Sequence, residues 1–142
     1  KVQPSLRGVG LTPANTEIQL DRYSALSPDG AEIAYIDKNR PFEGWKTILN
    51  KPGAWVQYNA IDFGNKKKKR VQIRALAPQG GILELRLNHP GGPLLAGLTL
   101  PAGSDWENYH FKIKNTGRGI DNLIVLLRSE SELEIDWLQF QP

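Results

Sequence analysis

The chain has 142 residues, of which 39% are hydrophobic and 23% charged, a length and composition typical of one folded domain. It contains no Cys, which excludes disulfides, thiol catalysis and cysteine-ligated zinc sites. The formal net charge of +3 is mild, and no stretch approaches about 18 apolar residues, so we expect no membrane span.

The first part of the chain differs in pattern from the rest. Residues 1–16 show no hydrophobic periodicity and are interrupted by Pro and Gly, which disfavour regular structure. We expect an interdomain connector here, followed by one domain over residues 17–142. Because the sequence starts at Lys1 without a Met, we also expect it to be part of a longer protein.

From Glu17 onward, short β-type runs alternate with turn signals that often combine Pro with Gly. The expected strands are Glu17–Tyr23, Glu32–Asp37, Ala54–Asp62, Arg70–Ala77, Ile82–Asn88, Leu94–Leu100, Glu107–Lys114, Leu123–Arg128 and Glu132–Phe140. Within Arg70–Ala77 and Ile82–Asn88, apolar residues alternate with polar ones, which indicates antiparallel strands with one buried face. We therefore predict an all-β fold, a jelly-roll β-sandwich of two antiparallel sheets.

One run of five positive charges, Lys66–Arg70, follows Phe63-Gly64-Asn65. Proteins that bind nucleic acids usually spread basic and aromatic residues over a face, whereas these charges occupy one loop between two ordinary strands. We interpret the run as a solvated hairpin turn and expect no nucleic-acid partner.

Residues suited to catalysis are few. The sequence holds no nucleophile elbow, phosphate-binding loop, zinc-protease motif or EF-hand loop. Its two His, His89 and His110, stand in different contexts, a Pro/Gly turn and a strand. Spacing alone does not exclude a pair of carboxylates from distant strands, but most acidic residues fall in turns or on polar strand faces. We predict no catalytic residue in this domain.

Aromatic residues near loops offer a different kind of site. Trp106 follows Gly103-Ser104-Asp105, Tyr35 stands near the end of its strand, and Trp45 lies among turn residues. Exposed rings suit sugars, because the apolar face of a pyranose stacks on a ring while its hydroxyls reach polar groups. The alternative is that these rings only cover the ends of the sandwich, and the residues alone leave both interpretations open.

Several motifs in sequence order resemble those of family 6 carbohydrate-binding modules. They are Ile18–Ser24 (family pattern I-(E/Q)-A-E-x-Y-S), Ala34–Asp37 (G-Y-I-D), Gly53–Asn59 with Ile61–Gly64 (G-D-W-V-E-Y-x-x-V-D-F-G), Leu83–Leu87, Trp106 and Ile135–Phe140. The resemblance covers Glu17 to Pro142. The connector is also similar to those of modules that follow family 43 glycoside hydrolases.

By position, the resemblance implies that Tyr35 and Trp106 form the family's sugar cleft. Glu134 stands where the family commonly has an Asn, and its carboxylate accepts hydrogen bonds but cannot donate as an amide does. Residues 39–52 exceed the short spacing of the family pattern. We expect this segment to be a defined loop that narrows the cleft, with Trp45 partly buried and able to bind sugar. It could instead close the cleft or pack against a neighbouring domain.

The resemblance also implies a structural calcium ion that ties the first and last strands together. The matching side chains are Gln19, Asp21 and Asp136, completed by backbone carbonyls. Such oxygen donors suit Ca²⁺, which prefers about 6–8 oxygen ligands.

The function that the resemblance implies is non-catalytic binding of polysaccharide or oligosaccharide. The module would target a glycoside hydrolase domain of the same parent chain to plant cell-wall polysaccharide of the xylan or arabinoxylan type. We expect the parent to be a secreted, periplasmic or cell-surface bacterial enzyme. The alternative is a structural accessory sandwich that stabilises the catalytic domain and whose sugar cleft is degenerate.

Overall fold

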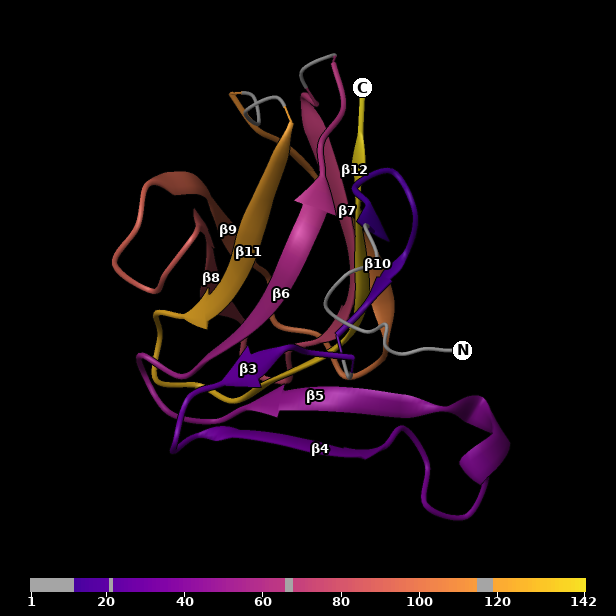
Figure 1. The fold of residues 1–142 in the computed structure, drawn as a ribbon. Helices are drawn as coiled ribbons and strands as arrows, with labels where there is room; N and C mark the ends of the chain where they lie inside the picture. The colour runs from indigo at the N-terminus through magenta and orange to yellow at the C-terminus, as the bar shows by residue number, and fades with distance from the viewer. Residues whose placement is uncertain (1–11, 21, 66–67, 115–118) are drawn as a thin grey trace.

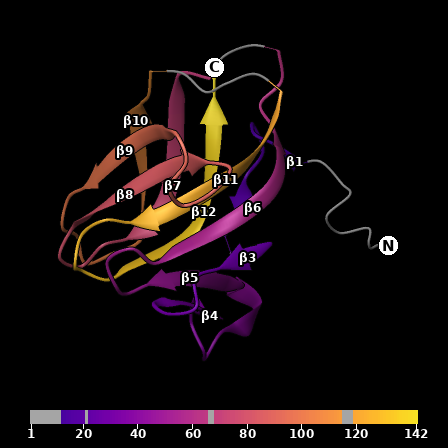
Figure 2. The ribbon, with the colours of Figure 1, turned by 60° about the vertical axis from the view of Figure 1, so that its left-hand side comes forward.

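The computed structural model describes residues 12–20, 22–65, 68–114 and 119–142, and these form two packed β-sheets (Figure 1). This arrangement confirms the predicted all-β sandwich. Within the described ranges, no helix has the length and apolarity needed to cross a bilayer. Figure 2 shows that β4 and β5 lie at one end of the sandwich, away from the C-terminus.

The first sheet has the strand order β1-β6-β11-β8-β9, with the short strand β3 also pairing with β6. Its strands are β1 (Thr12–Pro13), β3 (Ala25–Leu26), β6 (Trp55–Asp62), β8 (Gly81–Leu87), β9 (Leu94–Leu100) and β11 (Ile120–Leu127). The β1–β6 pair is parallel, and the other pairs in this sheet are antiparallel.

The second sheet has the strand order β10-β7-β12-β5-β4, with β2 pairing with β12. Its strands are β2 (Ile18–Gln19), β4 (Ala31–Tyr35), β5 (Trp45–Leu49), β7 (Arg70–Leu76), β10 (Glu107–Lys112) and β12 (Leu133–Gln141). All of these pairs are antiparallel.

The hydrophobic core fills the space between the sheets and follows the alternation in the sequence. In β7, Val71 and Ile73 are fully buried, whereas Arg74 faces outward on the same strand. Phe63 and Phe140 meet in the core edge to face, with ring centroids 5.2 Å apart. Each large side chain that is fully buried contributes roughly 1.5–3 kcal/mol to stability.

The sandwich begins before Glu17. Ala14 lies in the core, its N–H donates to Asp62 O and its carbonyl accepts from Phe140 N, each at 2.9 Å. The end of the segment predicted as a connector is therefore tied to both sheets, whereas residues 1–11 lie outside the described residues.

Residues 39–52 are not the loop that the turn residues predicted. A 3-10 turn, Pro41–Glu43, leads into β5, which pairs with β4 on one side and β12 on the other. Thr47 and Leu49 point into the core and are fully buried, which fixes β5 as an interior strand. The segment is therefore an integral part of the second sheet, in which β5 connects β4 to β12.

The basic run also differs from its predicted place. Lys69 and Arg70 lie where the chain passes from β6 in one sheet to β7 in the other, so the run belongs to a connection between sheets and not to a hairpin. Lys66 and Lys67 lie outside the described residues.

Candidate functional site

The β4–β5 hairpin brings two aromatic rings together at its free end. Tyr35 and Trp45 are directly opposed in the antiparallel register. Side chains at such positions start about 4.5–5.5 Å apart, so large rings meet. The two rings stack with centroids 4.1 Å apart and planes at 26°, and the residues are 40% and 43% exposed. Trp45 is therefore an exposed ring that stacks on Tyr35, and not the partly buried residue that was expected.

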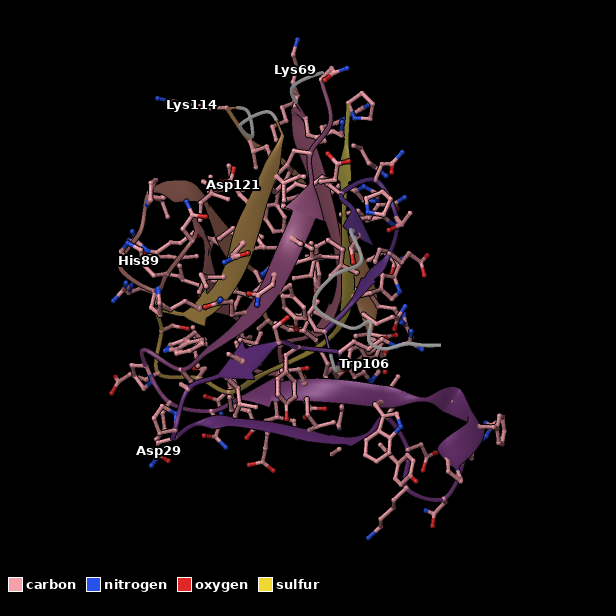
Figure 3. The ribbon with its side chains drawn as sticks, in the orientation of Figure 1. Asp29, Lys69, His89, Trp106, Lys114 and Asp121 are labelled. Carbon is pink, nitrogen blue, oxygen red and sulfur yellow. The ribbon has the colours of Figure 1, made fainter. Side chains whose placement is uncertain are left out.

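Trp106, labelled in Figure 3, lies in the loop between β9 and β10. It is partly buried, and the guanidinium of Arg74 lies 5.4 Å from its ring centroid. Arg74 comes from the outward face of β7, so the ring packs on the outside of the second sheet.

These three aromatic residues line one cleft of about 750 Å³. That volume lies within the usual range for small-ligand sites, roughly 300–1,000 Å³. The other lining residues are apolar (Ala34, Ile36 and Ile48) or polar (Asp37, Lys38, Asn39, Glu43 and Lys46). The combination of ring faces with nearby polar groups can bind a sugar. The structure therefore brings the predicted Tyr35, Trp45 and Trp106 to a common cleft.

Glu134, the fourth predicted sugar-binding residue, is not among the residues that line this cleft. Its Oε1 accepts a hydrogen bond from Lys46 Nζ, and both side chains are mostly buried, with 14% and 16% exposed. Lys46 does line the cleft, and sequence reasoning missed it. If β5 had been recognised as a strand, its alternation of buried and outward residues would have marked Lys46 as a residue on the outward face.

Further carboxylates surround this ion pair. Burial raises the pKa of Glu132 above its ordinary value, and the neighbouring carboxylates of Glu134 and Glu32 raise it further, while Lys46 lowers it. Glu32 and Glu134 both stand opposite Ile48, one on each side of β5. Lys46 is therefore a cation beside the carboxylates of Glu134 and Glu132.

The residues predicted to bind calcium are described in part. Gln19 in β2 lies opposite Trp137 in β12, and the next backbone N–H, of Leu20, donates to Asp136 O at 3.1 Å. The Asp136 carboxylate also accepts a hydrogen bond from Arg74 Nε at 3.2 Å. Asp21 lies outside the described residues, and the remainder holds no cluster of three or more His, Asp or Glu side chains placed for a metal. Gln19 and Asp136 fit Ca²⁺ in the chemistry of their oxygens and in their adjacent strands.

A protein family and a curated relative match this chain. The family described as carbohydrate binding module (family 6) matches residues 25–142. An arabinoxylan arabinofuranohydrolase of Paenibacillus polymyxa is 27% identical over 96 residues, which are 63% of this chain. The match spans only 15% of that enzyme's length.

Solved structures share the fold. CsCBM6-3 from Clostridium stercorarium, in complex with cellobiose, is 21% identical with a TM-score of 0.82, covering 93% of this chain and 97% of that one. A β-1,3-glucan binding CBM6 from Bacillus halodurans is 20% identical with a TM-score of 0.82, covering 94% and 100%. A glycoside hydrolase family 43 arabinoxylan arabinofuranohydrolase from Bacillus subtilis, in complex with cellotetraose, is 16% identical with a TM-score of 0.79, covering 93% of this chain but 28% of the enzyme.

Proposed function

Because the chain belongs to family 6 of the carbohydrate-binding modules, we propose that it binds polysaccharide or oligosaccharide in the cleft lined by Tyr35, Trp45 and Trp106. The observation that carries the proposal is that these three rings line one cleft of about 750 Å³. Sugar faces stack on such rings, and the polar groups beside them bind hydroxyls. No catalytic step is assigned to the domain.

The finer proposal concerns the parent protein. The module targets a glycoside hydrolase domain of the same chain to plant cell-wall polysaccharide, of the xylan or arabinoxylan type. Two similar proteins are arabinoxylan arabinofuranohydrolases, and this chain spans 15% and 28% of their lengths. Binding to the polysaccharide raises the effective concentration of substrate around an attached catalytic domain. Because such polysaccharide lies outside the cell, the parent is secreted, periplasmic or on the cell surface of a bacterium.

A structural calcium ion completes the proposal. Gln19, Asp21 and Asp136 hold it together with nearby backbone carbonyls. The pairing of β2 with β12 supports this, because it brings oxygen donors from the two ends of the sequence together. The ion supplies charge compensation for the carboxylates and cross-links β2 and β12.

The binding proposal is tested by isothermal titration calorimetry and affinity electrophoresis against a panel of soluble plant polysaccharides. We expect the wild type to bind at least one of them, and Trp106→Ala and Trp45→Ala to bind it at least about 10-fold more weakly, since stacked rings dominate such sites. Phe42→Ala is the matched control: Phe42 is an aromatic residue of the same hairpin that does not line the cleft. Wild-type protein that binds no glycan would overturn the proposal.

A second candidate function rests on Phe42. Its side chain is 77% exposed at the hairpin tip, where the Arg40 guanidinium lies 5.2 Å from the ring centroid. A ring so exposed suits contact with another domain, as in a structural accessory module. In the parent enzyme, Phe42→Ala would then lower the melting temperature of the catalytic domain without changing glycan affinity. An unchanged melting temperature contradicts the accessory role.

A further inference from the structure

The polar part of the cleft is built on one ion pair between two neighbouring strands. Lys46 in β5 and Glu134 in β12 are diagonal neighbours on the outward face of the second sheet, because Glu134 stands opposite Ile48 in register. Their contact joins residues 88 positions apart in the sequence, and both side chains are mostly buried. Lys46 lines the cleft and Glu134 does not. Of the two partners, only Lys46 therefore borders the space that a ligand would occupy.

The two groups differ in what they offer a sugar. An ionised carboxylate only accepts hydrogen bonds, whereas an ammonium group has three N–H donors. The described residues give Lys46 one hydrogen bond, to Glu134, so further donors remain for a ligand. We propose that Lys46 is the hydrogen-bond donor that contacts sugar in this cleft, and that its pairing with Glu134 restricts the ligand to uncharged sugars. This inference rests on the proposed function, and it assigns the polar contact to Lys46 rather than to the predicted Glu134.

The restriction to uncharged sugars follows from the surrounding charges. Lys46 already pairs with Glu134 and lowers the pKa of Glu132, which burial and the carboxylates of Glu134 and Glu32 raise. A uronic acid would bring a further carboxylate to the same cation. Even if it bound a free donor of Lys46, its carboxylate would stand beside those of Glu134 and Glu132, and like charges repel.

Other charges in the cleft do not offset this arrangement. Arg40 Nε pairs with Glu43 at 3.1 Å, and Asp37 Oδ1 accepts a hydrogen bond from Asn39 N at 2.9 Å. Lys38 lines the cleft too, but it is exposed, so water and salt screen its charge. The buried ammonium of Lys46 is therefore the donor with the larger effect on affinity.

The experiment compares a neutral ligand, xylohexaose or cellohexaose, with an oligogalacturonate of the same length, by calorimetry at fixed salt. We expect the wild type to bind a neutral ligand and the oligogalacturonate at least about 10-fold more weakly. Lys46→Met keeps the aliphatic stem and removes the donors, and should weaken neutral binding roughly 10-fold or more, the usual effect of losing a charge-assisted hydrogen bond. Lys38→Met is the matched control, with the same change on an exposed lysine of the same cleft, and should change affinity less than about threefold.

Two further variants distinguish the loss of a sugar contact from a loss of folding. Lys46→Met leaves Glu134 buried without its cation, so the double variant Lys46→Met/Glu134→Gln removes both charges and should fold while still binding weakly. Glu134→Gln alone should raise oligogalacturonate affinity relative to the neutral ligand, because the competing carboxylate is gone. The inference is overturned if the folded double variant binds neutral sugar as the wild type does, or if the wild type prefers the oligogalacturonate. If the wild type binds neither ligand nor any glycan of the panel, the proposed function fails and the inference fails with it.

Discussion

The guanidinium of Arg74 lies 5.4 Å from the centroid of the Trp106 ring, although Arg74 itself does not line the cleft. Arg74 is held in turn by Asp136, whose Oδ2 accepts a hydrogen bond from Arg74 Nε at 3.2 Å. The orientation of Trp106 therefore depends on a strand residue below the loop. A chain of contacts runs from Asp136, a proposed calcium ligand, to a ring of the sugar cleft.

We expect Arg74→Ala to weaken saccharide binding by about two- to fivefold, measured by calorimetry. The Trp106 ring would lose a cation–π contact of roughly 0.5–1 kcal/mol and gain freedom to rotate. Arg70→Ala is the control, because Arg70 lies on the same strand and its guanidinium donates to Pro142 O, at 3.1 Å from Nη2. Equal affinities of the two variants would contradict the role of Arg74.

The first sheet carries an ion cluster with a defined pH dependence. A hydrogen bond from Arg128, together with one from Arg86, lowers the pKa of Glu84 from 4.5 to about 2. Because the folded-state pKa lies below the unfolded value, this stabilisation is present above about pH 4.5 and is lost as the pH falls towards 2. Because the Arg128 side chain is half exposed, solvent screens its pairing with Glu84. We therefore place the contribution of the cluster to the free energy of unfolding on the order of 1–3 kcal/mol.

The test follows the thermal stability of Glu84→Gln between pH 7 and pH 2. We expect the variant to melt below the wild type at pH 7 and the difference to shrink steadily as the pH approaches 2. Glu17→Gln removes an exposed carboxylate outside the cluster and serves as control. A Glu84→Gln deficit that stays constant with pH would show that the ion pairs are not its source.

Ala60 in β6 has a positive φ of 57°, unusual for a residue with a side chain. It lies at an irregularity where the register between β6 and β11 shifts, and its N–H donates to Asn122 Oδ1 at 3.0 Å. A left-handed conformation costs an L-residue roughly 1–2 kcal/mol, part of which Gly recovers. We expect Ala60→Gly to raise the unfolding free energy by roughly 0.5–1 kcal/mol in urea denaturation. Ala96→Gly, on strand β9, should lower it, since Ala96 is not among the residues with positive φ.

Most strands could be predicted because one face of each is buried. The apolar alternation in Leu83–Leu87 and Val71–Ala75 has a period of two, and only an extended strand places every second side chain in the core. Strand β9 matches its predicted range, Leu94–Leu100, to the residue. The short strands β1 and β3 were missed, since two residues carry no readable period.

The β4–β5 hairpin was not predicted, because the turn-forming residues in 39–52 were read as a loop and the strand Trp45–Leu49 within them was overlooked. Ala34–Asp37 carries the letters of a family motif, but the strand that directly precedes Gly53–Trp55 is β5. Tyr35 lines the cleft together with Trp45, on which it stacks across the hairpin. The pairing of Lys46 with Glu134 could not be predicted, because it depends on the register between β5 and β12.

The proposed calcium ion makes a prediction about stability. If it cross-links β2 and β12, adding EDTA should lower the melting temperature, and adding excess Ca²⁺ should restore it, because a ligand that binds only the folded state stabilises it. Asp21→Asn and Asp136→Asn should each reduce the response to Ca²⁺, since an amide is a weaker ligand than a carboxylate for a hard cation.

The two calcium variants should also differ from each other in a way that the structure dictates. Asp136 holds Arg74, and Arg74 packs on Trp106, so Asp136→Asn should weaken sugar binding as well as calcium binding. Asp29→Asn is the control, because Asp29 is an exposed carboxylate that pairs with Lys51 at 2.7 Å and lies outside the proposed calcium site. The measurements are differential scanning fluorimetry with and without EDTA, and calorimetry with Ca²⁺ and with xylohexaose. A melting temperature indifferent to EDTA, in protein that shows no Ca²⁺ binding by calorimetry, would contradict the ion.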